Sequence, residues 1–277
     1  MNFNLCIDGA TVKVVDKDID FSESPVLDRP FMKVNHDSFF IDVKNIARYW
    51  VHDGEKVFIK PYDGIDDDSV DVFLQGTVLS ALLHQRSMMP LHGNSFEYEG
   101  KGVMICGNSG SGKSSVSAAF CRNGAKLISD DLSPIRIEGK DAIVVPLKSK
   151  VKLWNDALKK LNIENNGFAR IRPAFEKYYI PDFQLFNAEK KLDHIFILST
   201  HNTDEFIVEE LSGIAKYNVL RKQIYRRIYL KGMPNTEKEY FRKLLSVASG
   251  CKVTTIVRPQ ICDIYSAMDV VKKELTK

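Results

Sequence analysis

The sequence predicts a mixed α/β (α+β) chain in which a β-rich N-terminal part precedes a larger core. Three observations support this class. Residues 4–15, 39–43 and 54–61 are rich in apolar and β-branched residues, as strands are. An apolar segment at 103–106 leads into a glycine-rich loop and then a helix-like stretch. The last third alternates helix-like and strand-like patterns.

The N-terminal part is expected to be followed by a helix. A turn at Asp53-Gly54 precedes the strand in 54–61, and an acidic loop follows near residues 62–71. Residues 72–87 then carry apolar side chains at helical spacing. We therefore predict a β-rich segment over residues 1–70, packed on a core domain over residues 71–277. The side chains predicted to share one helix face are Phe73, Val78, Leu79, Leu82 and Leu83.

After this helix, the core is expected to contain a β-hairpin over residues 89–107 that turns at Glu99-Gly100. A helix should begin near Ser114 and stop at Asn123-Gly124. Residues 125–129 form a further predicted strand, and residues 193–200, 205–211 and 251–257 form later ones. Three C-terminal helices are predicted: one over 214–230, one that Asn235 caps, and one whose apolar stripe starts at Ile261.

Composition excludes several classes of protein. The chain has 277 residues, of which 44% are hydrophobic and 27% charged, with a net charge of +3. This balance is typical neither of a disordered chain nor of a general nucleic-acid binder. The sequence has no apolar run of membrane-spanning length and no secretory leader pattern, so we expect a cytoplasmic protein without membrane or nucleic-acid partners. The five scattered cysteines predict reduced thiols.

One motif carries specific chemistry. Residues 107–114, "GNSGSGKS", match G-x-x-x-x-G-K-[ST] between a predicted strand and helix. Glycines let successive backbone N–H groups point at phosphate oxygens, and the helix N-terminus adds its dipole. Lys113 supplies a charge for the β- and γ-phosphates, and the Ser114 hydroxyl suits Mg²⁺. The residues expected to bind nucleotide are Gly107, Asn108, Ser109, Gly110, Ser111, Gly112, Lys113, Ser114 and Ser115.

Two adjacent carboxylates follow the loop closely. Asp130 and Asp131 lie 17 and 18 residues after Lys113, at the end of the next predicted strand. One could hold a metal while the other accepts a proton from an attacking hydroxyl. The alternative is a solvated turn, since "DDLSP" has turn composition. The residues alone do not decide which aspartate would be the base.

His92 is the third candidate. If the hairpin closes at Glu99-Gly100, antiparallel pairing places His92 opposite Gly107. The imidazole could then act on a phosphate or steer a proton. The alternative is a packing histidine, because a one-residue shift in register would turn the ring to the other face.

Together the segments "LHG", "GKGVMICGNSGSGKSS" and "RNGAKLISDD" resemble the catalytic core of the HPr kinase/phosphorylase family. The resemblance is to its shorter kinase-related members, and it extends to "LLHQRSMMPLHG", "VKLWNDALKKL", "KYYIP", "IFILST" and "TTIVRP". It implies the P-loop core shared with phosphoenolpyruvate carboxykinase. Some members phosphorylate a serine of the carrier protein HPr, and related ones a peptide precursor's terminal serine or free serine.

The resemblance implies site roles and ligands. ATP and Mg²⁺ would be the cofactors, with Ser114 and Asp131 as metal contacts. Asp130, Asp131, His92 and Lys113 would be catalytic. The acceptor would be a serine-type hydroxyl on a peptide, a protein or a small molecule, and a homo-oligomer is compatible with the family.

Phosphoryl transfer also calls for a further cation near the transferring group. Among the basic residues between Lys148 and Lys177, Arg170 and Arg172 on a predicted loop are preferred. The sequence thus predicts an ATP-dependent serine kinase. A nucleotide hydrolase or switch, in which water is the acceptor, is the alternative.

Overall fold

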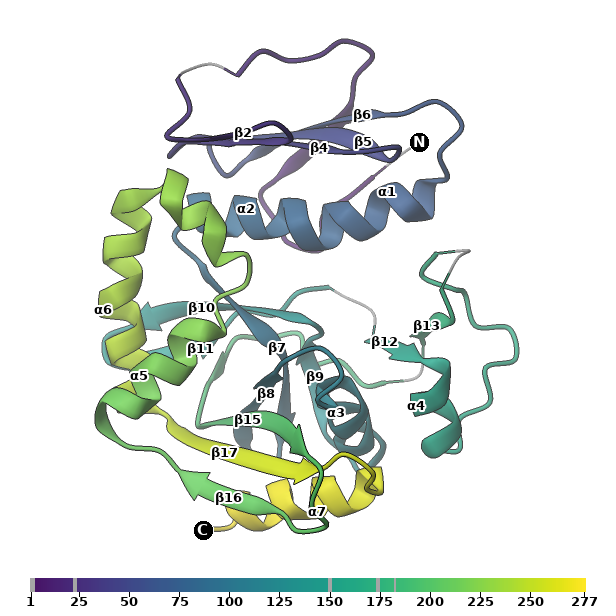
Figure 1. The fold of residues 1–277 in the computed structure, drawn as a ribbon, viewed down its shortest axis with the longest axis vertical. Coiled ribbons are helices and arrows are strands. Elements are labelled where there is room, and N and C mark those ends of the chain that lie inside the picture. Colours follow the sequence, from purple (N-terminus) through teal and green to yellow (C-terminus); the bar gives the residue numbers. More distant parts are fainter. Residues whose placement is uncertain (1–2, 22–23, 149–150, 173–174, 182) are drawn as a thin grey trace. The chain divides into compact units, whose positions relative to one another are not determined.

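The computed structural model describes residues 3–21, 24–148, 151–172, 175–181 and 183–277. The chain divides into two compact units (Figure 1). The first comprises Met1–Pro90 and Tyr225–Arg242, and the second Leu91–Ile224 and Lys243–Lys277. The predicted boundary near residue 70 falls inside the first unit, within helix α1 (Asp67–Phe73). In the described part of the chain, no helix is both long and apolar enough to span a membrane.

The first unit contains a six-stranded sheet in the order β1-β6-β5-β4-β3-β2. All neighbouring strands are antiparallel except the parallel pair β1 and β6. The predicted turn at Asp53-Gly54 is confirmed, and both residues have positive φ. The strands are β1 (Thr11–Val14), β2 (Leu27–Arg29), β3 (Met32–Val34), β4 (Ser38–Val43), β5 (Ala47–His52) and β6 (Lys56–Pro61).

The predicted helix after the acidic loop forms in this unit. It runs from α1 through a π-helical turn η1 (Leu74–Val78) into α2 (Leu79–Gln85). Asp66 caps α1 by accepting a hydrogen bond from the Ser69 N–H. The Tyr49 hydroxyl on β5 donates to the Val70 carbonyl at 3.0 Å, so this helix packs on the first sheet. This contact is why residues 67–85 belong with the N-terminal strands.

His84 on α2 is fully buried between two partners in the same unit. Its Nε2 lies 2.9 Å from the Tyr225 carbonyl oxygen and its Nδ1 lies 3.1 Å from the Tyr240 hydroxyl. Because a carbonyl can only accept, Nε2 carries the proton and Nδ1 accepts from Tyr240. Burial lowers the pKa of His84 to about 4 from its usual 6.5.

This pKa predicts a loss of stability in mild acid. The unfolded state takes up a proton on His84 near pH 6.5, whereas the folded state does so only near pH 4. The free energy of unfolding should therefore fall as the pH drops through this window, by about 2 kcal/mol between pH 7 and 5 for this residue. Urea unfolding curves at several pH values measure it. A His84→Gln variant should have a flatter pH profile; an equal slope in both proteins would contradict the assignment.

The second unit is built on a nine-stranded sheet in the order β14-β11-β10-β7-β8-β15-β17-β16, with β9 beside β7. Its strands are β7 (Met89–Tyr98), β8 (Lys101–Gly107), β9 (Lys126–Ser129), β10 (Leu132–Glu138), β11 (Asp141–Val144), β14 (Lys190–Lys191), β15 (His194–His201), β16 (Ile207–Glu210) and β17 (Lys252–Pro259). The first two residues of β7 belong to the first unit. A separate two-stranded sheet joins β12 (Val151–Trp154) to β13 (Lys177–Ile180).

The predicted hairpin is confirmed. Strands β7 and β8 pair antiparallel from Gly93↔Cys106 to Tyr98↔Lys101, so the turn lies at Glu99-Gly100. On the other side of β8, strand β15 pairs parallel to it, and β17 pairs parallel to β15. Parallel strands bring their carboxyl ends to the same edge of a sheet. The residues after β8, β15 and β17 therefore gather at one edge, next to the glycine-rich loop.

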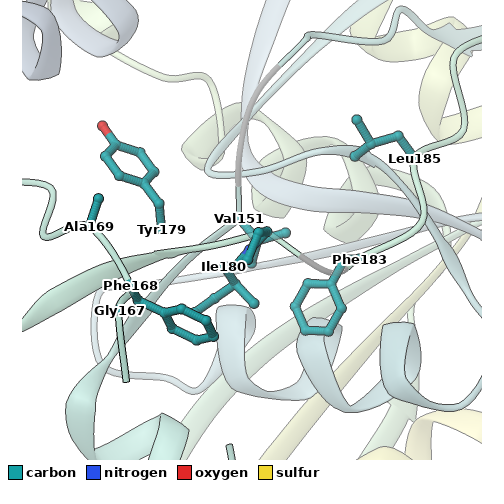
Figure 2. A pocket seen from close by; sticks show the side chains of 9 residues that line it. Val151, Gly167, Phe168, Ala169, Tyr179, Ile180, Phe183 and Leu185 are labelled. Carbon is teal, nitrogen blue, oxygen red and sulfur yellow. The ribbon is translucent and has the colours of Figure 1, made fainter. Parts of the chain in front are cut away.

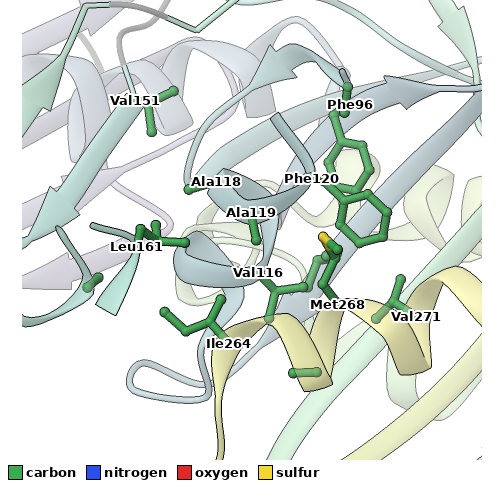
Figure 3. Close-up of a cluster of buried hydrophobic side chains, with 14 of the residues drawn as sticks. Phe96, Val116, Ala118, Ala119, Phe120, Val151, Leu161, Ile264, Met268 and Val271 are labelled. Carbon is green, nitrogen blue, oxygen red and sulfur yellow. The ribbon is translucent and has the colours of Figure 1, made fainter. Parts of the chain in front are cut away.

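Helix α3 (Lys113–Arg122) follows that loop and ends before Asn123 and Gly124, as predicted. Its apolar side chains pack with those of α7 (Ile264–Leu275) in one buried cluster (Figure 3). Phe120 on α3 stacks on Phe96 of β7, with ring centroids 4.9 Å apart. This packing holds α3 against the sheet that carries the loop. The remaining helices are α4 (Asn155–Lys160), α5 (Gly213–Lys222), η2 (Arg227–Gly232) and α6 (Pro234–Gly250).

Three helix boundaries differ from the prediction. The helix predicted over 214–230 stops at Lys222, because Ile224 instead forms a β-bridge with Leu91. Helix α6 begins at Pro234, so Asn235 lies inside it and is not its cap; proline suits a first helical position. Helix α7 begins at Ile264 with Asp263 as its cap, which leaves Ile261 outside the helix and 95% exposed.

Candidate functional site

The glycine-rich loop, residues 107–112, connects β8 to α3 in a conformation that requires glycine. Gly107 and Gly112 have φ angles of 142° and 97°. A Cβ atom on Gly107 would lie 2.2 Å from the Leu198 carbonyl oxygen and 2.7 Å from the Ser111 hydroxyl oxygen. Any side chain there would displace β15 or the loop. The strand–loop–helix context that the motif requires is therefore present.

Arg258 holds this loop from the end of β17. Its Nε donates to the Ser111 carbonyl at 2.8 Å, and its guanidinium lies 3.1 Å from where a Cβ on Gly112 would be. Sequence reasoning assigned Arg258 no role in the site. The contact joins residues 147 positions apart, and only the parallel order of β8, β15 and β17 brings them together.

The loop lysine is buried in its own turn. Lys113 is 6% exposed, and its Nζ donates to the Asn108 carbonyl at 3.2 Å. Burial lowers the pKa of Lys113, while the nearby Asp131 carboxylate opposes that shift. Nearby, the buried Ser111 hydroxyl has no hydrogen-bond partner among the residues that the structure describes. An unpaired buried hydroxyl is costly, so its presence in this loop fits a site for a hydrogen-bonding ligand.

The two aspartates occupy opposite environments. Asp130 is 5% exposed, and its Oδ1 lies 2.5 Å from the Asn94 side-chain nitrogen. Its Oδ2 accepts from the Lys152 backbone N–H at 2.9 Å. Burial, and then repulsion from Asp131, raise the pKa of Asp130 well above its usual range. Asp130 thus serves as a buried acceptor that joins β7 to β12.

Asp131 instead presents its carboxylate to several cations. It adopts a φ of 63°, and its side chain is 40% exposed. Burial alone would raise the pKa of Asp131. Nearby positive charges outweigh that effect and lower the pKa; they belong to Lys177, Lys152, His92 and Lys113. Lys177 pairs with Asp131, with its Nζ 3.6 Å from Oδ2. Two neighbouring carboxyls with opposite pKa shifts are typical of a reactive site.

His92 lies next to this pair. The paired part of the hairpin ends at Gly93↔Cys106, one position before the predicted partnership of His92 with Gly107. The Gly93 N–H donates to the Asp131 carbonyl at 3.1 Å, which brings His92 beside Asp131. The field of the imidazole contributes to the lowered pKa of Asp131. Its backbone N–H donates to the Gln223 carbonyl at 2.7 Å, which anchors this end of β7.

The residues present fit Mg²⁺. Magnesium in nucleotide sites usually takes one or two protein oxygens and completes its octahedron with phosphates and water. Ser114 offers a hydroxyl in the first turn of α3, and Asp131 offers a half-exposed ionised carboxylate. Asp130 is a poorer candidate, because both of its oxygens already accept hydrogen bonds from the protein.

The arginines that the sequence favoured contact aromatic rings. The guanidinium of Arg170 lies 5.8 Å from the ring centre of Tyr178, and that of Arg172 lies 5.2 Å from the ring centre of Phe175. Lys152 and Lys177 are two lysines whose charges act on both aspartates. In both "VKLW" and "KYYI", a lysine and an aromatic residue stand two positions apart, so they share one face of a strand. This pattern could have indicated Lys152 and Lys177 from the sequence.

An apolar pocket of about 350 Å³ lies against the Val151↔Ile180 end of the small sheet (Figure 2). None of the predicted site residues lines it. Val151, Ile180, Phe168 and Phe183 converge on its centre. The charged cluster around Asp131 and this pocket are therefore separate features of the same unit. The full lining is Val151, Gly167, Phe168, Ala169, Tyr179, Ile180, Pro181, Phe183 and Leu185.

Comparisons with known proteins add little to this geometry. No protein-family model matches the sequence, and no curated protein matches it. Among solved structures, the chain is similar to the Hpr(Ser) kinase/phosphatase from Coxiella burnetii, with 14% sequence identity and a TM-score of 0.36. The match covers 68% of this chain and 90% of that one. A superposition this loose carries no inference about function, which rests on the site itself.

Proposed function

We propose that this protein is an ATP-dependent kinase that transfers the γ-phosphoryl group to a serine-type hydroxyl. The observation that carries the proposal is the position of the ionised Asp131 carboxylate, in the field of the loop lysine and beside His92. A nucleotide-binding loop alone would not suggest a phospho-acceptor. An ionised carboxylate beside such a loop would supply the base that an attacking hydroxyl needs.

The proposed roles follow from the contacts. The loop N–H groups and Lys113 would bind the triphosphate at the N-terminus of α3. Mg²⁺, held by Ser114 and Asp131, would supply charge neutralisation at the phosphate oxygens. The acceptor hydroxyl would give its proton to Asp131 as its oxygen bonds to the γ-phosphorus. The bond between that phosphorus and the β–γ bridging oxygen breaks, and ADP leaves.

His92 and Asp130 would support this step. The imidazole beside Asp131 would contact the transferring phosphate or help to move the proton. Asp130 would accept the hydrogen bond from the Lys152 backbone and so keep Lys152, and the lysine on the paired strand, near Asp131. The acceptor would be a peptide, a protein or a small molecule with a serine-type hydroxyl.

Analysis of the reaction products tests the proposal. The protein is incubated with Mg²⁺ and γ-labelled ATP, together with free serine, serine-containing peptides or a cell extract that contains candidate acceptors. We expect the label to appear on a hydroxyl of an acceptor, identified by mass spectrometry. Release of labelled phosphate alone, at the same rate with and without acceptors, would instead show a nucleotide hydrolase.

A further inference from the structure

The small sheet of β12 and β13 has two different faces. Directly opposite residues in an antiparallel pair point to the same side, and successive residues alternate. Val151, Leu153, Tyr178 and Ile180 form the buried face and join the apolar cluster around α3. The other face carries two lysines and two aromatic residues. These are Lys152 opposite Tyr179, and Trp154 opposite Lys177.

This second face is attached directly to the aspartate pair. The Lys152 N–H donates to Asp130 Oδ2 at 2.9 Å, and Asp130 in turn contacts Asn94 on β7. A two-stranded sheet is only marginally stable on its own, so such attachments decide where its side chains lie. The attachment places the next lysine on this face, Lys177, against Asp131.

Lys177 is held in place from two sides. Its Nζ lies 3.6 Å from Asp131 Oδ2 and 5.9 Å from the ring centre of Trp154, and only 14% of its side chain is exposed. The Trp154 indole, itself 49% exposed, offers its face to the ammonium group. A surface lysine that merely improved solubility would be more exposed and more mobile than this one.

The chemistry at Asp131 requires a cation at this position. A phosphate cannot approach an ionised carboxylate closely unless positive charge lies between or beside them. Lys113 provides charge from the loop side, and the Lys177 ammonium lies 3.6 Å from the Asp131 carboxylate on the side of β13. The charges of both lysines act on Asp131.

We infer that Lys177 is a second phosphate-binding cation, which contacts the phosphoryl group in transit while Trp154 and the Asp130 contact to β12 hold it there. The inference rests on the proposed nucleotide chemistry, but not on which acceptor is used. Charge on a phosphoryl group in transfer spreads over its three equatorial oxygens, and a preplaced cation stabilises it most at that stage. Lys177 should therefore matter more for turnover than for binding the ground-state nucleotide.

The test compares Lys177→Met with Lys160→Met. Methionine keeps much of the lysine stem against Trp154 but removes the charge, and Lys160 is an exposed lysine on the neighbouring helix α4. Calorimetry measures the affinity of each protein for Mg·ADP, with and without aluminium fluoride, which mimics the phosphoryl group in transit. We expect Lys177→Met to bind Mg·ADP within about threefold of the wild type, but the aluminium fluoride complex about 10²-fold more weakly. Lys160→Met should match the wild type in both.

Two further measurements keep the outcome clear. Melting temperatures check that each variant is folded, and Lys177→Arg, which retains the charge, should recover part of the lost affinity. Equal affinity of wild type and Lys177→Met for the aluminium fluoride complex would overturn the inference, as would an equal loss of both ligands. The labelled-ATP assay on the wild type decides separately whether the protein is a kinase, because Lys177 would serve transfer to water as well as to serine.

Discussion

Asp131→Asn is expected to reduce turnover by about 10²–10⁴-fold, the usual contribution of a general base. Asparagine keeps the shape of the side chain but cannot take the proton from an attacking hydroxyl. It also removes the negative charge that Lys177 and Lys113 surround. Because Asp131 is also a proposed metal contact, the Mg²⁺ concentration needed for half-maximal rate should rise.

Asp130→Asn tests whether Asp130, rather than Asp131, is the general base. An asparagine there still has an oxygen that can accept from the Lys152 N–H, so its turnover should fall far less than that of Asp131→Asn. Asp269→Asn, at an exposed position on α7, serves as a control and should match the wild type. Initial rates at saturating ATP across a range of Mg²⁺ concentrations measure all three. Normal turnover in both Asp130→Asn and Asp131→Asn would mean that the pair is only a turn.

Lys113→Ala is expected to abolish tight nucleotide binding. The ammonium group is buried in the loop, so a bound phosphate would interact with it in a partly desolvated site. Loss of one member of such a buried charge pair costs about 2–5 kcal/mol, which corresponds to roughly 30-fold to several-thousand-fold in affinity. The loop supplies no other side-chain charge of its own.

Titration calorimetry with Mg·ATP measures this effect. Lys113→Met tests the charge with less loss of packing, and Lys126→Ala, at the exposed start of β9, controls for a change in net charge alone. Wild-type affinity in both Lys113 variants would exclude the loop as the nucleotide site. A lowered melting temperature with normal affinity would mean that the buried lysine is structural.

The sequence predicted those parts of the site that depend on local patterns. The residues of the turn specify the register of the hairpin. Counting residues from the turn therefore predicted that β7 runs close to the loop. The start and end of α3 follow from local glycine and capping preferences. The separate roles of Asp130 and Asp131 could not be predicted, because the hydrogen-bond donors of Asp130 are Asn94 and Lys152, which lie in other elements.

Long-range contacts account for the remaining differences. Arg258 reaches the loop only because β17 lies two strands away from β8 in the sheet. Lys177 reaches Asp131 only because β13 pairs with β12 and β12 is attached to Asp130. The segment after α5 leaves its helical pattern because Ile224 pairs with Leu91. No propensity within a short window encodes such pairings.

The first unit is built from two segments that are far apart in the chain, and this limits the order in which the protein can fold during synthesis. Its sheet and the α1–α2 segment are complete by residue 90, yet both hydrogen-bond partners of His84 come from Tyr225 and Tyr240. Until the ribosome has released the chain beyond residue 240, the buried imidazole has neither partner and its surroundings stay open. The 134 residues of the second unit's first segment, 91–224, are therefore made before the first unit can close. A fragment ending at residue 90 should accordingly fail to reach the native packing around α2.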